Sequence, residues 1–392
     1  MISVEEAKRI MMERVWTTML YDVSPDQAMG FVLARDMRAS FAFPLFDMSA
    51  VDGYAFCGEG PEWKQVGNIA AGEVLGRFLH TGECVRIFTG AHVPTGSNAV
   101  AMQERCEMKD GTLRIAGDVP AAGSNIRRRA EGWKEGDVLL HGGAMVDAPS
   151  VGVIAAAGIS DVTIHASPAV NIVRTGNEFF DGGEELMPGR IFSSNEWMLS
   201  AALRRENIFI NDGAFVAGDR ENELMDALNE ANNTSDVIIT SGGVSVGDHD
   251  LVADVLKKLG ATIHFHGVAQ KPGKPMLFAQ WDKTFVFGLP GNPRAVMVLF
   301  WEYVLPFLRA MQGAKDPWLK TDHVPLAHDV QVKGDRAEFR AAQVKGGKVT
   351  LLADEGSHML RSLVDADALA YIPAEARALR EGDPIEIHYL PR

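Results

Sequence analysis

The sequence feature that most restricts the fold is an alternation of strand-like and helix-like segments between residues 169 and 312. Short apolar segments alternate there with longer amphipathic ones. The expected strands are 170–173, 208–215, 237–240, 262–268, 276–278 and 284–287, and the expected helices are 195–206, 219–231, 249–259 and 292–311. This rhythm predicts a three-layer α/β domain, in which helices cover both faces of a mostly parallel sheet. Ligands of such domains bind at the carboxyl ends of the strands.

The regions on either side of this domain have a different texture. Residues 43–145 and 316–392 contain short apolar runs separated by glycine, proline and aspartate, which predicts an inserted β-rich domain and a small C-terminal β barrel. Helical patterns are expected at 3–18, 24–37 and 150–157. We therefore predict a multidomain α/β plus β protein, with a helical linker domain at 1–42 and 146–168, the β-rich domain at 43–145, the α/β domain at 169–315 and the barrel at 316–392.

The composition excludes several classes of protein. With 38 Lys and Arg against 52 Asp and Glu, the formal charge is −14, so the chain lacks the basic surface that sequence-independent nucleic-acid binding needs. The three cysteines form no CxxC pair, which argues against a disulfide scaffold or a thiolate zinc site and favours a reducing compartment. No segment has the ~18 consecutive apolar residues of a membrane helix. We expect a cytoplasmic protein without nucleic-acid or membrane partners.

The strongest candidate for chemistry is the glycine-rich segment 241–247 (SGGVSVG), which follows an expected strand. Glycines let backbone N–H groups approach a ligand and a helix start favours anions, so the segment predicts a phosphate site. A tight strand-to-helix turn is the alternative. The nearby carboxylates of Asp248 and Asp250 suggest that a divalent metal takes part. The candidate binding residues are Ser241, Gly242, Gly243, Ser245 and Gly247.

Two further loops of the α/β domain are candidate binding segments. Lys271 and Lys274 lie in a rigid Lys-Pro-Gly-Lys-Pro segment that suits an oxyanion, although a solvated turn would also explain them. The segment 288–293 (GLPGNP) precedes a long expected helix, and helix capping explains Asn292 and Pro293. Capping does not explain the preceding step of Pro290 and Gly291, which favours a binding role for all four residues.

Several charged residues are weaker candidates when each is taken alone. Glu178 follows the first strand of the α/β domain, and Asp219 stands near a helix start, where capping and metal binding explain it equally well. Asp52 and Thr89 lie in loops of the β-rich domain, where a turn residue is the plain alternative. The run of arginines at 127–129 is either a solvated face or part of an anion site.

Seven short motifs follow one another along the chain. They are 49–55 (SAVDGYA), 87–91 (IFTGA), 125–129 (NIRRR), 175–178 (TGNE), 241–247 (SGGVSVG), 271–275 (KPGKP) and 288–293 (GLPGNP). In this order and at these spacings they resemble the molybdopterin molybdenumtransferase family, the bacterial MoeA type that also occurs as the E domain of gephyrin. The resemblance covers nearly the whole chain.

The resemblance implies a function in the last step of molybdenum cofactor synthesis. Members of this family insert molybdenum from molybdate into adenylylated molybdopterin and release AMP, with the help of Mg²⁺. Their fold combines an elongated helical domain, an inserted β domain, an α/β domain of molybdopterin-binding type and a C-terminal β barrel. They act as homodimers with active sites composed of loops from both subunits. Molybdopterin adenylyltransferase and proteins that mature molybdoenzymes would be their partners.

The resemblance also implies a role for individual residues. The residues that match catalytic positions are Asp52, Thr89, Glu178 and Asp250, and those that match metal-binding positions are Glu178, Asp219 and Asp250. The segment 241–247 would cradle the pterin phosphate. The residues that resemble the molybdate pocket are Lys271, Lys274, Arg340 and Ser357.

The chain departs from the family pattern at a few positions. Gly132 stands where an aspartate is usual, Ala295 where a serine is common, and His266 or Gly267 where a lysine is often found. Two alternatives therefore stay open: a molybdopterin adenylyltransferase built on the α/β domain, and a non-catalytic molybdopterin-binding scaffold with the same fold. The presence of Asp52, Glu178 and Asp250 favours an enzyme over the scaffold.

Overall fold

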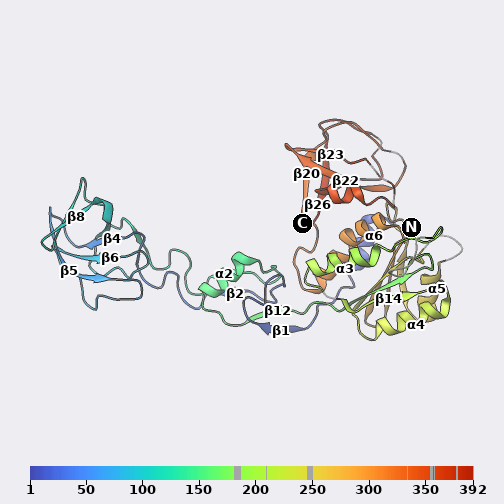
Figure 1. Cartoon of the computed structure of the whole chain (residues 1–392), viewed down its shortest axis with the longest axis horizontal. Coiled ribbons are helices and arrows are strands. Elements are labelled where there is room, and N and C mark those ends of the chain that lie inside the picture. Colours follow the sequence, from blue (N-terminus) through green and yellow to red (C-terminus); the bar gives the residue numbers. More distant parts are fainter. Residues whose placement is uncertain are drawn as a thin grey trace. The chain divides into compact units, whose positions relative to one another are not determined.

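Figure 1 shows the computed structural model of the chain, which describes residues 1–180, 187–208, 210–244, 250–332, 334–353, 356, 358–376 and 378–391. The chain forms two compact units. The first comprises residues 1–34, 143–147 and 161–392, and the second comprises residues 35–142 and 148–160. None of the helices in these described ranges is both long and apolar enough to cross a membrane.

The first unit contains a six-stranded sheet in the order β14-β13-β15-β19-β18-β16. Its strands are β13 (Val170–Thr175), β14 (Ile210–Ala217), β15 (Val237–Ser241), β16 (Thr262–His266), β18 (Leu277–Trp281) and β19 (Thr284–Leu289). Four neighbouring strands, β14, β13, β15 and β19, run parallel to one another. Strand β18 pairs antiparallel with both β19 and β16. The prediction of a mostly parallel sheet is confirmed. Because Ser241 lies opposite both Arg174 and Leu289, the carboxyl ends of β13, β15 and β19 meet at one edge.

Helices cover both faces of this sheet. They are α3 (Asn195–Arg205), α4 (Glu221–Asn232), α5 (Leu251–Lys258), α6 (Pro293–Leu299) and α7 (Leu305–Met311). Ile238 of β15 is buried in the core shared with α4 and α5, whereas its neighbour Ile239 is buried in the core shared with α3, α6 and α7 (Figure 1). Successive side chains of a strand point to opposite faces, so an apolar run such as β15 is typical of a sheet buried on both sides.

The helix expected at 292–311 is interrupted in its middle. A π-helical turn, η2 (Phe300–Val304), separates α6 from α7. Pro306 has no N–H to donate to the carbonyl of Glu302, four residues earlier, which accounts for the change in winding. Glu302 and Tyr303 of this turn are both buried, at 2% and 0% exposure.

The C-terminal strands form a second six-stranded sheet in the first unit. The elements are β17 (Gln270–Lys271), β20 (Thr321–Pro325), β22 (Ala337–Lys345), β23 (Lys348–Leu351), β24 (Ala368–Ile372), β26 (Pro384–Tyr389), the short pair β21 (Val330–Gln331) and β25 (Ala378–Leu379), and the helix α8 (Arg361–Asp365). The strand order is β17-β22-β24-β26-β20, with β23 beside β22. Strand β17 comes from the α/β part of the chain and leads into the segment 271–275, which we call the lysine loop. Its pairing with β22 therefore fixes the start of the lysine loop against the C-terminal sheet. The closure of these strands into a barrel stays a prediction.

The N-terminal segment contains one helix rather than the two expected. Helix α1 (Val4–Met12) begins at Ser3, whose hydroxyl accepts from the Glu6 N–H as a capping pattern predicts. The helix predicted at 24–37 is wrong. Gly30 has a φ of +80°, and the backbone continues into bridges of Val32 with Met145 and of Leu33 with Ile164, next to the pair β1 (Leu20–Val23) and β12 (Val162–His165). Long-range pairing here overrides a local helical pattern.

The second unit is built on a six-stranded sheet in the order β7-β4-β6-β5-β9-β8. Its elements are β4 (Gly53–Phe56), β5 (Trp63–Ile69), β6 (Glu83–Ile87), β7 (Ala99–Met102), η1 (Gln103–Arg105), β8 (Cys106–Lys109) and β9 (Thr112–Ile115), with the pairs β2 (Met37–Arg38) and β11 (Val138–Leu140), β3 (Met48–Ser49) and β10 (Ile126–Arg127), and the helix α2 (Ala148–Ala156). Burial raises the pKa of Cys84 to about 12 and that of Cys106 to about 11, so both thiols stay protonated at neutral pH.

Candidate active site

Three of the predicted loops meet at the carboxyl edge of the α/β sheet. The backbone N–H of Gly242 donates to the carbonyl of Leu289 at 3.0 Å. The Thr175 hydroxyl donates to the carbonyl of Ser241 at 3.5 Å. These contacts join the segments that follow β13, β15 and β19, as the topology of a parallel sheet requires.

The two glycines after Ser241 allow a close approach between two of these loops. Gly242 and Gly243 have φ values of +92° and +65°. A Cβ atom on Gly242 would lie 2.7 Å from the Thr175 hydroxyl oxygen, and one on Gly243 would lie 3.0 Å from it. Backbone geometry and contact with Thr175 are therefore sufficient to explain both glycines, in agreement with the tight-turn alternative.

Asn195, the first residue of α3, connects two of the loops and was not among the predicted site residues. Its side-chain nitrogen donates to the Ser241 hydroxyl at 2.7 Å and to the Gly291 carbonyl at 2.9 Å. The residue is 4% exposed, and its Oδ1 is a buried acceptor without a partner among the described residues. The sequence signal is weak, since an asparagine at a helix start is usually explained as a cap.

A cavity of about 420 Å³, which we call the cationic pocket, opens beside this edge. It lies between the lysine loop, the start of α6 and strand β22. It is lined by Gln270, Lys271, Pro272, Gly273, Lys274, Pro275, Pro290, Asn292, Arg294, Ala295, Arg336, Glu338, Phe339, Arg340 and Gly356. The pocket brings together five predicted residues, Lys271, Lys274, Pro290, Asn292 and Arg340, and adds the cations Arg294 and Arg336, which the sequence did not single out.

The charges that line the cationic pocket are mostly positive. Among its described lining residues, five are lysine or arginine and one, Glu338, is acidic. Glu338 Oε2 accepts from Arg340 Nε at 2.7 Å and lies 2.6 Å from its Nη2, so this carboxylate offsets the charge of Arg340. Arg294, which is 2% exposed, donates to the Ser362 hydroxyl of α8 at 2.8 Å. Lys271, Lys274 and Arg336 add positive charge to the lining, which favours an anionic ligand.

A second cavity of about 430 Å³ lies next to the cationic pocket, and Asn292 lines both. We call it the adjacent pocket. It is lined by Glu178, Phe179, Ile191, Phe192, Ser194, Asn195, Gly291, Asn292, Pro293 and His358. The lining combines apolar and aromatic side chains with the polar groups of Glu178, Ser194, Asn195, Asn292 and His358, a combination found in sites for small molecules. The predicted residues Glu178, Gly291, Asn292 and Pro293 therefore share one cavity.

The three predicted metal-binding acids do not gather into a preformed cluster. Asp250 caps α5, where its Oδ1 accepts from the Ala253 N–H at 3.0 Å and its Oδ2 lies 2.8 Å from His266 Nε2. Asp219 accepts from the Asn177 side chain at 2.9 Å. Across the described ranges, no three His, Cys, Asp or Glu side chains are grouped as they would be around a metal ion.

In the second unit, the predicted pair Asp52 and Thr89 is in direct contact. The backbone N–H and the hydroxyl of Thr89 both donate to Asp52 Oδ1, at 2.8 Å each. These hydrogen bonds hold the pKa of Asp52 below its ordinary value, so the side chain is a carboxylate at neutral pH. Two residues from different loops thus form one polar unit, which exceeds what a turn aspartate requires.

The arginine run is partly structural. Arg128 Nη1 donates to Asp47 Oδ2 at 2.6 Å, and the Arg129 N–H donates to Asp47 Oδ1 at 2.8 Å. Burial raises the pKa of Asp47, but these donors outweigh it and leave the pKa below its ordinary value. A Cβ atom on Gly132 would lie 3.1 Å from the Phe43 carbonyl oxygen, so the backbone here leaves little room for the aspartate that the family pattern expects.

The predicted residues Ser245, Gly247 and Ser357 lie outside the described residues, as does Asp248. The notable residues that the sequence reasoning missed are Asn195, Gln270, Arg294, Arg336 and Glu338. None of them lies inside one of the glycine-rich motifs, although Gln270 directly precedes the segment 271–275 and Arg294 directly follows the segment 288–293.

Comparisons with known proteins agree along the whole chain. Residues 2–158 match the family model described as MoeA N-terminal region (domain I and II), residues 172–310 match a probable molybdopterin binding domain, and residues 323–390 match MoeA C-terminal region (domain IV). A molybdopterin molybdenumtransferase of Haemophilus influenzae is 30% identical over 400 residues, which cover 99% of this chain and 98% of the relative. One of Nostoc sp. is 31% identical over 385 residues, covering 93% and 87%. The solved molybdopterin biosynthesis moeA protein of Pyrococcus horikoshii OT3 is 27% identical, with full coverage of both chains and a TM-score of 0.83.

Proposed function

The chain belongs to the molybdopterin molybdenumtransferase family of molybdenum cofactor biosynthesis, and from this premise we propose that it inserts molybdenum from molybdate into adenylylated molybdopterin and releases AMP. The observation that carries the proposal is the cationic pocket. Molybdate is a tetrahedral dianion, and a cavity with an excess of ammonium and guanidinium groups offers it charge-assisted hydrogen bonds. The adjacent pocket is suited to hold the pterin next to it.

The proposed division of roles follows the two pockets. Lys271, Lys274 and Arg340 bind molybdate, together with Ser357. The segment 241–247 binds the phosphate of the pterin through backbone N–H groups other than that of Gly242, which donates to the Leu289 carbonyl. Asn195 connects the loop of Ser241 to the loop of Gly291. Cleavage of the phosphoanhydride breaks the bond between the adenylyl phosphorus and the bridging oxygen, which stays on the pterin phosphate, while an oxygen of water or of molybdate forms the new bond to the adenylyl phosphorus of the departing AMP. The positive charge of the pocket stabilises the charge that develops on the phosphoryl oxygens.

Magnesium is part of the proposal, with Glu178, Asp219 and Asp250 as the protein ligands. Mg²⁺ is usually held by one or two carboxylates together with substrate phosphates rather than by a protein cage. Separate carboxylates, as seen among the described residues, are compatible with such a site once a phosphoanhydride supplies the other oxygens. When bound, the ion would neutralise phosphoryl charge.

We also propose that the protein acts as a cytoplasmic homodimer, in which Asp52 and Thr89 of one subunit complete the site of the other. The two-residue unit of Asp52 and Thr89 supports a functional role for this loop. A molybdopterin adenylyltransferase would supply the adenylylated substrate.

Release of AMP from adenylylated molybdopterin, measured against molybdate concentration, tests the proposed reaction. We expect AMP release that depends on molybdate, and half-saturating molybdate raised roughly ten- to hundred-fold in Lys271→Ala and in Lys274→Ala, because each substitution removes a charge-assisted contact worth about 1.5–3 kcal/mol. Lys283→Ala is the control, since Lys283 lies in the turn between β18 and β19 and does not line the pocket. Equal losses of molybdate and pterin binding would assign the lysines to the phosphate instead. Formation of adenylylated product from ATP would favour the adenylyltransferase alternative, and pterin binding without AMP release would favour the scaffold.

A further inference from the structure

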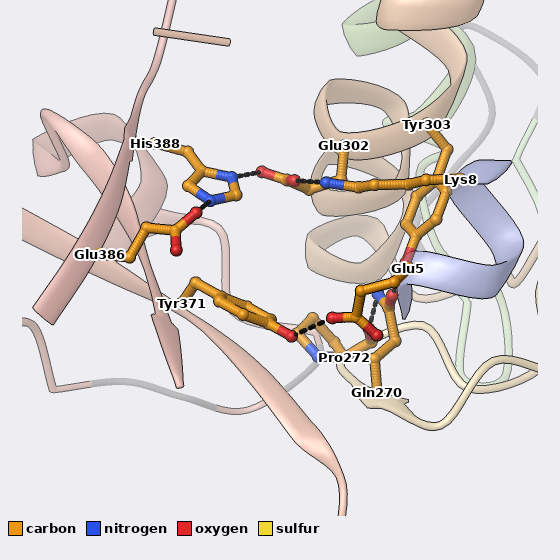
Figure 2. A network of polar contacts seen from close by, with 9 residues as sticks. All are labelled: Glu5, Lys8, Gln270, Pro272, Glu302, Tyr303, Tyr371, Glu386 and His388. Atoms are coloured by element: carbon orange, nitrogen blue, oxygen red, sulfur yellow. Dashed lines mark hydrogen bonds and ion pairs between the residues drawn. The ribbon is translucent and has the colours of Figure 1, made fainter. Parts of the chain in front are cut away.

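Gln270 stands directly before the lysine loop and is completely buried, at 0% exposure. Its side-chain nitrogen donates to the carbonyl of Pro272 at 2.8 Å, and its side-chain oxygen accepts from the hydroxyl of Tyr303. Figure 2 shows the three residues in contact, with Tyr303 reaching the glutamine from η2. Two successive hydrogen bonds therefore connect Tyr303 of η2, through Gln270, to the backbone between Lys271 and Lys274.

The direction of each hydrogen bond in this chain is fixed by chemistry. The Pro272 carbonyl can only accept, so the amide nitrogen of Gln270 must face it. The amide oxygen must then face Tyr303, whose hydroxyl has to donate. Burial raises the pKa of Tyr303 well above its ordinary value, so the phenol keeps the proton that it donates. The glutamine has one orientation that satisfies both partners.

The lysine loop is held by backbone contacts on either side of Pro272, and Gln270 supplies the contact in between. The Val268 N–H donates to the Lys274 carbonyl at 2.9 Å, and strand β17 pairs with β22. Gly273 has a φ of +95°, and a Cβ atom there would lie 2.7 Å from the Leu299 side chain, so the loop presses closely on α6. The Pro272 carbonyl lies between the two lysines, and its partner is the Gln270 side chain.

The turn that carries Tyr303 is itself anchored. The preceding residue, Glu302, accepts from Lys8 Nζ at 2.8 Å and lies 2.7 Å from His388 Nδ1 (Figure 2). Tyr303 therefore comes from a turn that is held by Lys8 of α1 and His388 of β26. The position of the Tyr303 hydroxyl, which donates to Gln270, is fixed in this way.

We propose that Gln270 and Tyr303 are positioning residues, which set the orientation of the Pro272 carbonyl and with it the directions in which Lys271 and Lys274 enter the cationic pocket. The proposal rests on the proposed function, in which those lysines bind molybdate. Gln270 and Tyr303 act through the loop and do not themselves provide the charge that binds the oxyanion. Their loss should weaken molybdate binding more than it slows the saturated reaction.

The test uses Gln270→Leu, Tyr303→Phe and the double variant in the full-length protein. The first readout is the half-saturating molybdate concentration against the maximal rate of AMP release. The second is amide hydrogen exchange at Val268 and Met276, whose N–H groups donate to the loop carbonyls of Lys274 at 2.9 Å and of Gly273 at 3.3 Å. This measurement needs no substrate. The control is Gln280→Leu, because Gln280 makes the same kind of contact, from its side chain to the carbonyl of Asp282 two residues on at 3.1 Å, in a turn that does not line the pocket.

We expect Gln270→Leu to raise half-saturating molybdate roughly tenfold, which corresponds to about 1.4 kcal/mol, while the maximal rate falls less. Tyr303→Phe should give a smaller rise. The double variant should be no worse than Gln270→Leu, because both substitutions break one chain of contacts. Amide exchange at Val268 and Met276 should quicken in all three variants and stay as in the wild type in Gln280→Leu.

Two results would overturn the inference. One is a lower melting temperature of Gln270→Leu with unchanged half-saturating molybdate, which would mean that the glutamine serves stability alone. The other is unchanged amide exchange at Val268 and Met276. If the wild-type protein releases no AMP in response to molybdate, the proposed function fails, and the exchange measurement still decides whether Gln270 and Tyr303 hold the loop.

Discussion

At the scale of single residues, several polar side chains have a structural duty that is separate from any chemical role. Asp250 is the clearest case. Its Oδ1 caps α5 through the Ala253 N–H, and its Oδ2 lies against His266. A loss of activity after Asp250→Ala would therefore combine a lost cap with a lost charge. The two duties have to be separated by the choice of substitution.

Asp250→Asn separates them, because asparagine caps helices as well as aspartate does but carries no charge. We expect Asp250→Asn to keep the helix cap and lose the charge beside His266, so that its melting temperature falls less than that of Asp250→Ala, and to lose AMP release. Asp250→Ala should lose AMP release and, in addition, about 1 kcal/mol of the free energy of unfolding. Both are measured by thermal unfolding and by the molybdate-dependent assay over a range of Mg²⁺ concentrations. If Asp250→Asn keeps full activity, the carboxylate is a cap alone.

At the scale of elements, a buried charged network joins α1, η2 and β26. Glu302 is 2% exposed, and Lys8 and His388 lie against its two oxygens (Figure 2). His388 also faces Glu386 at 3.0 Å. Burial by itself raises the pKa of Glu302, but the contacts with His388 and Lys8 outweigh it and leave the pKa below its ordinary value of 4.5. The ionised carboxylate therefore stabilises the packing of the C-terminal sheet on the helical layer.

The sign of this shift predicts how stability depends on pH. A carboxyl whose pKa is lower in the folded state contributes stability above pH 4.5, and the contribution is lost as the pH falls through the folded value. Glu302→Gln should lower the free energy of unfolding by about 3 kcal/mol at neutral pH, since it removes the negative charge that pairs with the mostly buried Lys8 ammonium. The difference from the wild type should shrink below pH 4.5. Urea unfolding of both proteins, at several pH values between about 3.5 and 8, measures this difference in the free energy of unfolding.

The matched control for this prediction is Glu381→Gln. Glu381 pairs with Lys348 at 3.0 Å on the surface, with both side chains more than half exposed. Exposed pairs of this kind contribute little to stability, so the urea midpoint should stay close to that of the wild type at every pH. A difference between Glu302→Gln and the wild type that is constant down to pH 3.5 would contradict the assigned titration.

At the scale of the whole molecule, the candidate residues divide between the two units of the chain. Asp52 and Thr89 belong to the second unit, and the two pockets belong to the first. A homodimer with composite sites would bring Asp52 of one subunit to Asp250 of its partner copy. A two-fold interface would form two equivalent sites of this kind.

Subunit exchange tests this arrangement. Asp52→Ala and Asp250→Asn should each be inactive alone. After mixing and random exchange, about half of the dimers should be mixed, and each mixed dimer should have one intact site, so roughly a quarter of all sites should recover. AMP release per site, with the exchange confirmed by native mass spectrometry, measures the recovery. Activity that stays at background after complete exchange would place both residues in the site of one subunit.

The sequence by itself determined the α/β architecture and the loops that carry the candidate chemistry. The apolar run of β15 follows Asp236 and ends before Gly242, and a continuous run of this length matches a strand buried on both faces of a sheet, so local pattern and tertiary fold agree. The motifs at 241–243, 271–275 and 288–293 were identifiable because glycines and prolines leave few backbone conformations for such segments.

Only the tertiary structure decided which side chains converge and which local patterns fail. Asn195, Gln270 and Arg336 stand in ordinary sequence, and their roles come from contacts with residues far along the chain. The residues at 24–37 carry a helical pattern, yet their backbone finds partners in Met145 and Ile164 that no local window contains. Long-range pairing and burial outweigh propensities of a few tenths of a kcal/mol per residue, on the order of 0–0.7, and such contacts exist only once the chain has folded.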